Sequence, residues 1–202
     1  MIKFLRKVLI LIISGFLFGG CAVPYYNIKP ETINYTTEIK ENNINFSYRY
    51  DVLRERGNKR YAKKEDIKNI KVLAVRITNN SDNDIAIGKD LFFYCDSTQI
   101  YPLDPYLARN ELKQLAATHL FYLLLTPMQL YTGNDSFPIG LILGPGISLG
   151  NLFSASSANN HMLFEFTKYY ILNKTIKKGE TAYGIFAFRN IGYNPLCLKQ
   201  NF

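Results

Sequence analysis

The segment Gly146–Gly150 has the pattern G-x-S-x-G, with Ser148 at its centre. In hydrolases this motif holds a serine nucleophile on a sharp turn between a strand and a helix, and an acid and then a histidine follow along the chain. The only histidine after Ser148 is His161, which comes before the remaining glutamates, and no aspartate follows. We therefore interpret Ser148 as a small residue in a packed turn. A small serine hydrolase acting through Ser148 is the least favoured function.

His161 and Glu165 are four residues apart on one predicted helix, and His119 lies on the other. Structural and catalytic zinc sites need three or four ligands at a fixed spacing, and the chain has neither a CxxC motif nor a Cys/His cluster. Phosphate-binding and dinucleotide-binding glycine loops are also missing. We predict no metal site and no cofactor, and we interpret these residues as polar groups in a helix interface.

The first twenty-one residues have three zones: a start with three basic residues, an apolar run over residues 8–18, and the pair Gly19-Gly20 before Cys21. This is the organisation of an export signal, whose apolar run spans about 7 to 15 residues. The run is shorter than the roughly 20 residues that span a bilayer comfortably. Residues 17–21, Leu-Phe-Gly-Gly-Cys, resemble the lipobox of bacterial lipoproteins, with Phe18 where leucine is usual.

This resemblance implies that residues 1–20 are a signal peptide and that Cys21 receives a diacylglycerol on its thiol and an acyl chain on its new amino group. Two or three buried chains anchor a protein stably, at about 0.8 kcal/mol per CH₂. Ala22 follows the cysteine where an aspartate would favour retention, so the resemblance implies sorting to the outer membrane. Residues 22–27 lack an acidic cluster, which favours the periplasmic side.

Removal of the signal lowers the formal charge from +8 to +5, because three basic residues leave with it. The densest basic stretch, residues 54–64, lies next to acidic residues and has Tyr61 as its one aromatic side chain. Single-stranded nucleic acid needs aromatic stacking platforms along a basic groove, so we predict no nucleic-acid partner. We interpret this stretch as a solvated loop that can touch anionic lipid heads or glycan.

Two cysteines, Cys95 and Cys197, remain in a compartment that permits disulfides. Each lies in an apolar, strand-like run. They either form one disulfide across about a hundred residues or stay as two separate buried thiols, and the spacing favours neither alternative.

Apolar residues alternate along several short segments separated by Asn-rich and Asp-rich turns, a pattern that predicts antiparallel strands. Strands spaced by about ten residues are typical of a sandwich. The predicted strands are 44–50, 70–78, 85–87, 91–95, 99–103, 181–188 and 195–199.

Helical signals interrupt the strands over about 104–172. Asp104 followed by Pro105 is an N-cap with proline at the first helical position, and a second helix is predicted from about Leu149 to Leu172. The predicted fold is therefore mainly β with a helical insertion, an α+β fold in which a two-helix hairpin interrupts an antiparallel sandwich. Residues 21–42 are predicted to be a tether, and 43–202 a single domain.

Two segments carry a second resemblance. Val72 to Phe93 contains a strand that ends in Asn-Asn-Ser, and Ile176 to Phe188 contains a Lys-Lys-Gly-Glu-Thr turn before Tyr-Gly. Both are similar to segments of immunoglobulin-like envelope lipoproteins. The resemblance implies an immunoglobulin-like sandwich that binds or scaffolds rather than catalyses.

Residues 114–164 carry a single formal charge, Asp135, and within them 137–153 is rich in glycine and apolar residues. Gly140/Gly144 and Gly146/Gly150 have the i, i+4 spacing that allows helices to approach closely. This stretch is a buried loop, an exposed apolar tip that enters the bilayer or docks on a partner, or a membrane-spanning hairpin, which Pro138 and Pro145 disfavour. The candidate contact residues are Phe137, Ile139, Leu141, Ile142, Leu143, Ile147 and Leu149.

These observations predict a non-enzymatic, lipid-anchored binding or scaffold protein of the cell envelope, held at the outer membrane through Cys21 and facing the periplasm. Its expected partners are the membrane and an envelope protein or glycan. The alternative is a membrane-active or transport-accessory protein that inserts residues 137–153.

Overall fold

The computed structural model describes residues 21–132 and 135–200, so the predicted signal peptide, residues 1–20, lies outside the described residues. The described chain divides into two units. Residues 21–24 and 114–158 form the hairpin unit, and residues 25–113 and 159–200 form the β unit.

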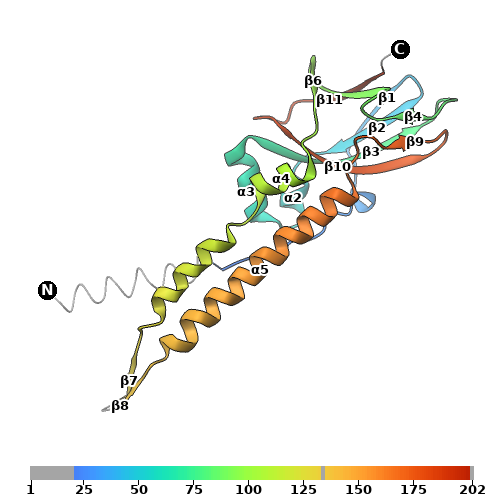
Figure 1. The fold of residues 1–202 in the computed structure, drawn as a ribbon. Coiled ribbons are helices and arrows are strands. Elements are labelled where there is room, and N and C mark those ends of the chain that lie inside the picture. The colour runs from blue at the N-terminus through green and yellow to red at the C-terminus, as the bar shows by residue number, and fades with distance from the viewer. Residues whose placement is uncertain (1–20, 133–134, 201–202) are drawn as a thin grey trace. The chain divides into compact units, whose positions relative to one another are not determined.

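The β unit contains two larger antiparallel sheets (Figure 1). In the four-stranded sheet the order is β1 (Thr37–Glu41), β2 (Ile44–Arg49), β3 (Ile70–Asn79) and β10 (Thr181–Arg189). In the three-stranded sheet the order is β11 (Leu196–Gln200), β5 (Leu91–Cys95) and β6 (Thr98–Ile100). A small pair joins β4 (Ile85–Ala86) to β9 (Thr175–Ile176). The expected α+β class with antiparallel strands is confirmed.

The two larger sheets share one hydrophobic core. The ring of Phe93 on β5 lies 6.0 Å from that of Phe46 on β2 and 4.6 Å from that of Phe186 on β10, measured between centroids. Such aromatic pairs stabilise a core beyond the area they bury. Leu73, Val75 and Ile77 of β3 point to this core, and Val72 and Ala74 on the other face of the strand are fully buried too.

Three helices accompany the sheets in the β unit: α2 (Val52–Glu55), α3 (Lys59–Lys68) and α4 (Pro105–Leu112). The cap of α4 is confirmed, since Asp104 accepts hydrogen bonds from the backbone of Tyr106 at 2.8 Å and Leu107 at 3.4 Å. The prediction of a loop after β2 was wrong, because residues 52–68 form α2 and α3. In α3, Tyr61, Ala62 and Glu65 are buried. Because Glu65 is charged, the sequence shows no apolar stripe at helical spacing, and the helix was not predicted.

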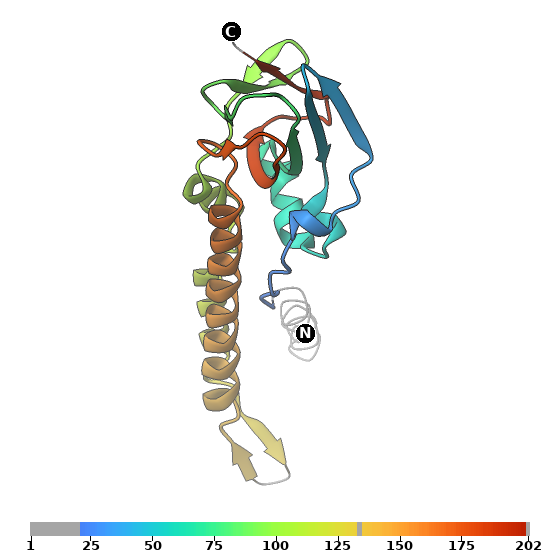
Figure 2. The same cartoon turned by 90° about the vertical axis from the view of Figure 1, so that its right-hand side faces the viewer.

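The hairpin unit contains the 3-10 helix η2 (Ala116–Leu125), the short strands β7 (Leu130–Thr132) and β8 (Asp135–Phe137), and α5 (Gly140–Lys168), which continues into the β unit. Figure 1 and Figure 2 together show η2 alongside α5, with the β7–β8 pair at the end of both. The predicted boundaries differ here. The first predicted helix is broken between α4 and η2, and α5 begins about nine residues before the predicted start and includes Pro145.

The segment predicted as a tether has defined contacts. Tyr25 and Ile28 are buried, Pro30–Thr32 forms a 3-10 turn, and Thr37–Glu41 is the edge strand β1. Within the β unit the sequence from Tyr25 onward is therefore part of the packed structure.

Candidate membrane-contact site

The buried side of α5 in the hairpin unit consists of small residues. Gly140, Gly144, Ser148, Ala155 and Ala158 recur at helical spacing along α5, and all five are buried. A Cβ atom at Gly140 would overlap the carbonyl oxygens of Leu125 and Thr126, and one at Gly144 would lie 2.6 Å from Thr126 Oγ1. Only glycine at these two positions allows α5 to approach the chain at the end of η2 so closely.

The outer face of the same unit consists of large apolar side chains. Ile142 is 75% exposed and Phe153 is 66% exposed, and in the facing segment Phe121 and Leu124 are more than 70% exposed. The other exposed apolar residues of the hairpin unit are Leu115, Leu120, Leu123, Met128, Leu130, Tyr131, Phe137, Leu141 and Leu149. Only Asp135 carries a formal charge among residues 114–158.

This distribution is the reverse of that expected for a helix pair in water, where large apolar residues face the partner helix. In lipid there is no hydrophobic gain from pairing apolar faces, so small residues occupy the helix interface and large apolar residues face outward. Large apolar side chains exposed in such number on one unit are typical of an interaction site. The hairpin unit therefore buries small residues of α5 and exposes large apolar ones.

The seven predicted contact residues lie at the β7–β8 end of this unit. Phe137, Leu141, Ile142 and Leu149 are exposed, and Ile139, Leu143 and Ile147 are partly exposed. The two glycine pairs differ. Gly140 and Gly144 line the hairpin interface, whereas no atom lies within 4 Å of a Cβ placed at Gly146 or Gly150.

The hairpin unit also holds the backbone next to Cys21, which is itself exposed. The amide nitrogen of Ala22 donates to Asn151 Oδ1 at 2.6 Å. Val23 donates to Gln114 Oε1 at 3.1 Å and its carbonyl accepts from Gln114 Nε2 at 2.7 Å. The residues that follow the predicted lipidation site are thereby attached to α5 and to the start of the hairpin.

A group of hydrogen bonds to Glu165, which the sequence analysis did not predict, holds residues 25–29 of the β unit. The buried carboxylate of Glu165 accepts hydrogen bonds from Tyr25 Oη at 2.6 Å and from the backbone nitrogens of Ile28 and Lys29, both at 2.9 Å. Burial and the adjacent Glu165 carboxylate raise the pKa of Tyr25. The one sign of this arrangement in the sequence is Glu165 itself, a charged residue between Phe164 and Phe166 in the second predicted helix.

The residues considered for catalysis do not form a nucleophile elbow. Gly146–Gly150 lies inside α5 as continuous helix, and Ser148 is fully buried, with an Oγ that makes no hydrogen bond to any described residue. His119 is buried in the hairpin unit with its ring 6.2 Å from that of Tyr122, and His161 is exposed in the β unit. The strand, turn and helix that the motif requires are not present at Ser148.

Cys95 and Cys197 are free thiols. They lie on the paired strands β5 and β11, but Cys95 is directly opposite Leu196 and Cys197 is opposite Tyr94. Neighbouring residues of a strand point to opposite faces of a sheet, so the two thiols face away from each other. In this structure the two cysteines are therefore separate thiols, the second of the two alternatives.

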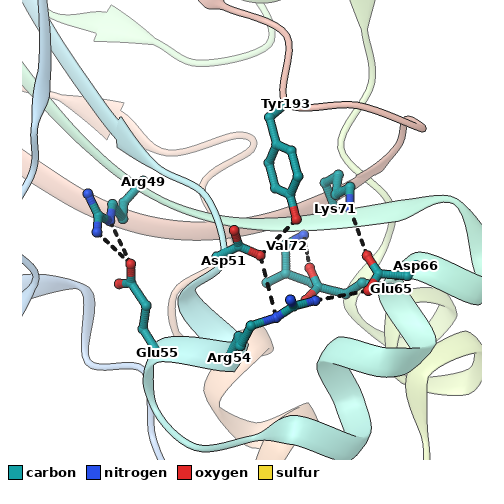
Figure 3. Close-up of polar contacts among 9 residues, drawn as sticks. All are labelled: Arg49, Asp51, Arg54, Glu55, Glu65, Asp66, Lys71, Val72 and Tyr193. Carbon is teal, nitrogen blue, oxygen red and sulfur yellow. Dashed lines mark hydrogen bonds and ion pairs between the residues drawn. The ribbon is translucent and has the colours of Figure 1, made fainter.

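A group of charged residues surrounds α2 and α3 in the β unit (Figure 3). Glu65 is buried and accepts a hydrogen bond from the backbone nitrogen of Val72 at 2.7 Å. Burial raises the pKa of Glu65 to about 8. Asp66 accepts from Lys71 at 3.0 Å and from Arg54 at 2.9 Å, and the bond from Lys71 lowers the pKa of Asp66.

The described residues contain no group of three or more His, Cys, Asp or Glu side chains that could hold a metal ion. In the part of the chain that the structure describes, no helix has both the length and the apolar character to cross a membrane. Comparisons with family models, with curated proteins and with solved structures gave no match.

Proposed function

We propose that this chain is a non-enzymatic, lipid-anchored protein of the bacterial cell envelope whose hairpin unit enters the bilayer. The observation that carries the proposal is the distribution of side chains in the hairpin unit, where α5 buries glycine, alanine and serine while large apolar side chains are exposed. Burial of an exposed Leu, Ile or Phe side chain in an apolar medium stabilises by about 1.5–3 kcal/mol. Insertion of several such residues supplies a strong attraction without a membrane-crossing helix.

The anchor in this proposal is the acylated Cys21. Its support is the lipobox and the attachment of Ala22 and Val23 to Asn151 and Gln114. Because these partners belong to the hairpin unit, the acyl chains start from the same unit that exposes the apolar face. The two membrane attachments then act on one leaflet, and we assign that leaflet to the periplasmic side of the outer membrane.

The β unit in this proposal is an immunoglobulin-like binding or scaffold module for an envelope protein or glycan. Its shared core between two antiparallel sheets supports the assignment. A polar hollow at one end is lined by Asn42, Asn43, Ser81, Asn83, Asp84, Ile85, Asp90 and Gln200. Amides and carboxylates of this kind can hydrogen-bond the hydroxyl groups of a sugar.

The test is co-flotation with vesicles of pure phosphatidylcholine. The protein is the chain from residue 21 with Cys21→Ser, so that no acyl chain contributes. We expect flotation that persists at high salt. Ile142→Asp is expected to weaken binding about tenfold or more, with unchanged circular dichroism and melting because the side chain is 75% exposed.

The matched control is Ile191→Asp in the β unit, where the isoleucine is 81% exposed. The same chemical change there should leave flotation intact. If the unmodified protein stays at the bottom of the gradient, or if both variants float equally well, the hairpin does not enter lipid. Labelling with palmitate tests the anchor separately: the label should enter the full chain and be lost in its Cys21→Ser variant.

A further inference from the structure

The two edges of the four-stranded sheet in the β unit differ. At the β10 edge, the backbone nitrogen of Ile185 donates to the carbonyl of Tyr169 at 2.7 Å. The backbone nitrogen of Leu103 donates to the carbonyl of Ala187 at the same edge, also at 2.7 Å. Other segments of the β unit therefore cover this edge. At the opposite edge, β1 pairs with β2 (Figure 1), and no strand of the described chain pairs with the outer side of β1.

The backbone groups on the outer side of β1 belong to Glu38 and Lys40. The turn between β1 and β2 consists of Asn42 and Asn43, both with positive φ. Two-residue turns of this kind are type I′, and the residues on either side of them form a hydrogen-bonded pair. Such pairs alternate along an antiparallel ladder, so Glu41 and every second residue before it bond to β2. The N–H and C=O groups of Glu38 and Lys40 then point away from β2.

The side chains of these two residues make the edge complementary to itself. Glu38 and Lys40 are exposed and flank Ile39. When a second copy pairs antiparallel with β1 so that the two Ile39 residues are opposite each other, Glu38 of each copy is directly opposite Lys40 of the other. Opposite charges in such positions stabilise a strand pair, and like charges destabilise it. A register shifted by two residues would oppose two copies of Glu38 or two of Lys40, so the charges favour a single register.

Ile39 adds an apolar contact in the same register. Its side chain is partly buried and packs against the shared core. A small hollow at this edge has an apolar lining made of Ile39, Ile44, Phe46, Leu91 and Leu198. Opposed residues of an antiparallel pair lie on the same face of the sheet, so Ile39 of a second copy would contact Ile39 beside this hollow. Burial of this apolar surface favours association.

We propose that two copies of this chain form a symmetric dimer through β1, in which the two four-stranded sheets join at Ile39 into one antiparallel sheet. A twofold axis requires a self-complementary interface, and Glu38 of one copy exchanges backbone hydrogen bonds with Lys40 of the other. The strand lacks the usual protection of an open edge, since it contains no proline and pairs with β2 residue for residue, without a bulge. This inference concerns the β unit alone and is independent of the proposed membrane contact.

The first test places single cysteines in β1 and measures disulfide-linked dimer after mild oxidation. The protein is the chain from residue 21 with Cys21→Ser and Cys197→Ser, in a mild detergent that covers the apolar side chains of the hairpin unit. The two Ile39 residues would be opposed without bonding to each other, and Cα atoms of such a pair are about 4.5 Å apart. A disulfide spans this distance, so Ile39→Cys should form a linked dimer.

Two further cysteine variants test the register. Thr37→Cys or Glu41→Cys alone separates the two thiols by about 13 Å along the strand, which is too far for a disulfide. Neither variant should form a linked dimer by itself. A mixture of the two should form one, because Thr37 of one copy is opposite Glu41 of the other in this register.

The second test reverses charges in the Ile39→Cys protein. Glu38→Lys or Lys40→Glu opposes like charges at two positions and should slow linkage in dilute protein about tenfold. A mixture of these two variants opposes unlike charges again and should recover fast linkage, which also shows that both variants fold. Lys89→Glu, at another exposed lysine of the β unit, is the matched control and should leave linkage unchanged.

Three results would overturn the proposal. Absence of a linked dimer from Ile39→Cys would leave the β1 edge to a strand of another protein. Equal linkage in Ile39→Cys, Thr37→Cys and Glu41→Cys alone would point to association through the hairpin unit, which does not select a register in β1. Slow linkage in the mixture of the two charge variants would show that Glu38 and Lys40 are not opposed.

Discussion

Asn151 accepts a hydrogen bond from the backbone nitrogen of Ala22, at 2.6 Å, across 129 positions of the sequence. The other side of the same amide donates to the carbonyl of Ile147 at 2.9 Å, one turn earlier in α5. That second bond sets the orientation of the side chain, so that its oxygen faces Ala22. The residue after the predicted lipid attachment site is in this way held by the helix that exposes the apolar face.

Loss of this bond should release the start of the chain. In the chain from residue 21 with Cys21→Ser, Asn151→Ala removes a hydrogen bond worth about 1 kcal/mol, so amide exchange at Ala22 and Val23 should become about fivefold faster. Asn151→Asp keeps an acceptor oxygen and should preserve slow exchange. Asn160→Ala, at an exposed position of α5, is the control. Unchanged exchange in Asn151→Ala, measured by mass spectrometry, would contradict this account.

Two glycines of α5 should respond oppositely to the same substitution. Gly140→Ala places a methyl group against the carbonyls of Leu125 and Thr126, and overpacking of this kind costs about 1–3 kcal/mol. Gly150→Ala meets no atom within 4 Å and should raise stability by about 0.5–1 kcal/mol through helix propensity. Thermal unfolding followed by circular dichroism measures both. Equal effects would show that α5 does not approach residues 125–128 closely.

The β unit should lose stability as pH rises. The pKa of Glu65 is about 8 in the folded chain and about 4.3 when unfolded, so the folded state holds an extra proton between these values. The contribution of Glu65 to the free energy of unfolding is then fully present below about pH 4 and is lost as the pH rises to about 8. The slope is at most about 1.4 kcal/mol per pH unit.

Urea unfolding at several pH values measures this dependence. Glu65→Gln cannot ionise and should remove most of the decline, while its amide oxygen can still accept the hydrogen bond from Val72. A variant that declines with pH as steeply as the unmodified protein would exclude Glu65 as the responsible group.

Tyr25 should contribute to stability mainly through its hydroxyl group. Tyr25→Phe keeps the ring, which packs edge-on against Tyr61 at a centroid distance of 5.5 Å, but removes the hydrogen bond to Glu165. Hydrogen bonds to charged groups contribute about 1.5–3 kcal/mol, and urea unfolding should show a loss of that order. Tyr26→Phe, in which the neighbouring tyrosine is 54% exposed, should change the free energy of unfolding little. Similar losses in both variants would argue against a stabilising hydrogen bond from Tyr25 to Glu165.

Local patterns predicted most strands of the β unit. The apolar runs over 70–78 and 181–188 correspond to β3 and β10, and both strands bury residues on their two faces. The cap at Asp104 was predictable for a similar local reason. The edge strand β1 was not, since its residues are mostly exposed and form no such run.

Helix predictions failed where tertiary contacts outweighed local preference. Pro145 and Gly140 argue against helix on propensity, yet both lie in α5. The close approach of Gly140 and Gly144 to residues 125–128 accompanies this early start, which is consistent with tertiary packing overriding propensity. Likewise, α3 has too few apolar residues to show a helical stripe, because its inward face includes the buried Glu65.

The sequence by itself determined the α+β composition, the positions of most strands in the β unit, the long segment with one charge and the lipobox-like segment that motivates the proposed anchor. Each of these depends on residue type and short spacing alone. Only the tertiary structure decided that the large apolar residues of the hairpin unit face outward, that Asn151 and Gln114 hold the backbone after Cys21, and that Glu65 and Glu165 are buried. These properties depend on contacts between residues far apart in the chain, and two faces of a uniformly apolar helix can be distinguished only when its partner is in place.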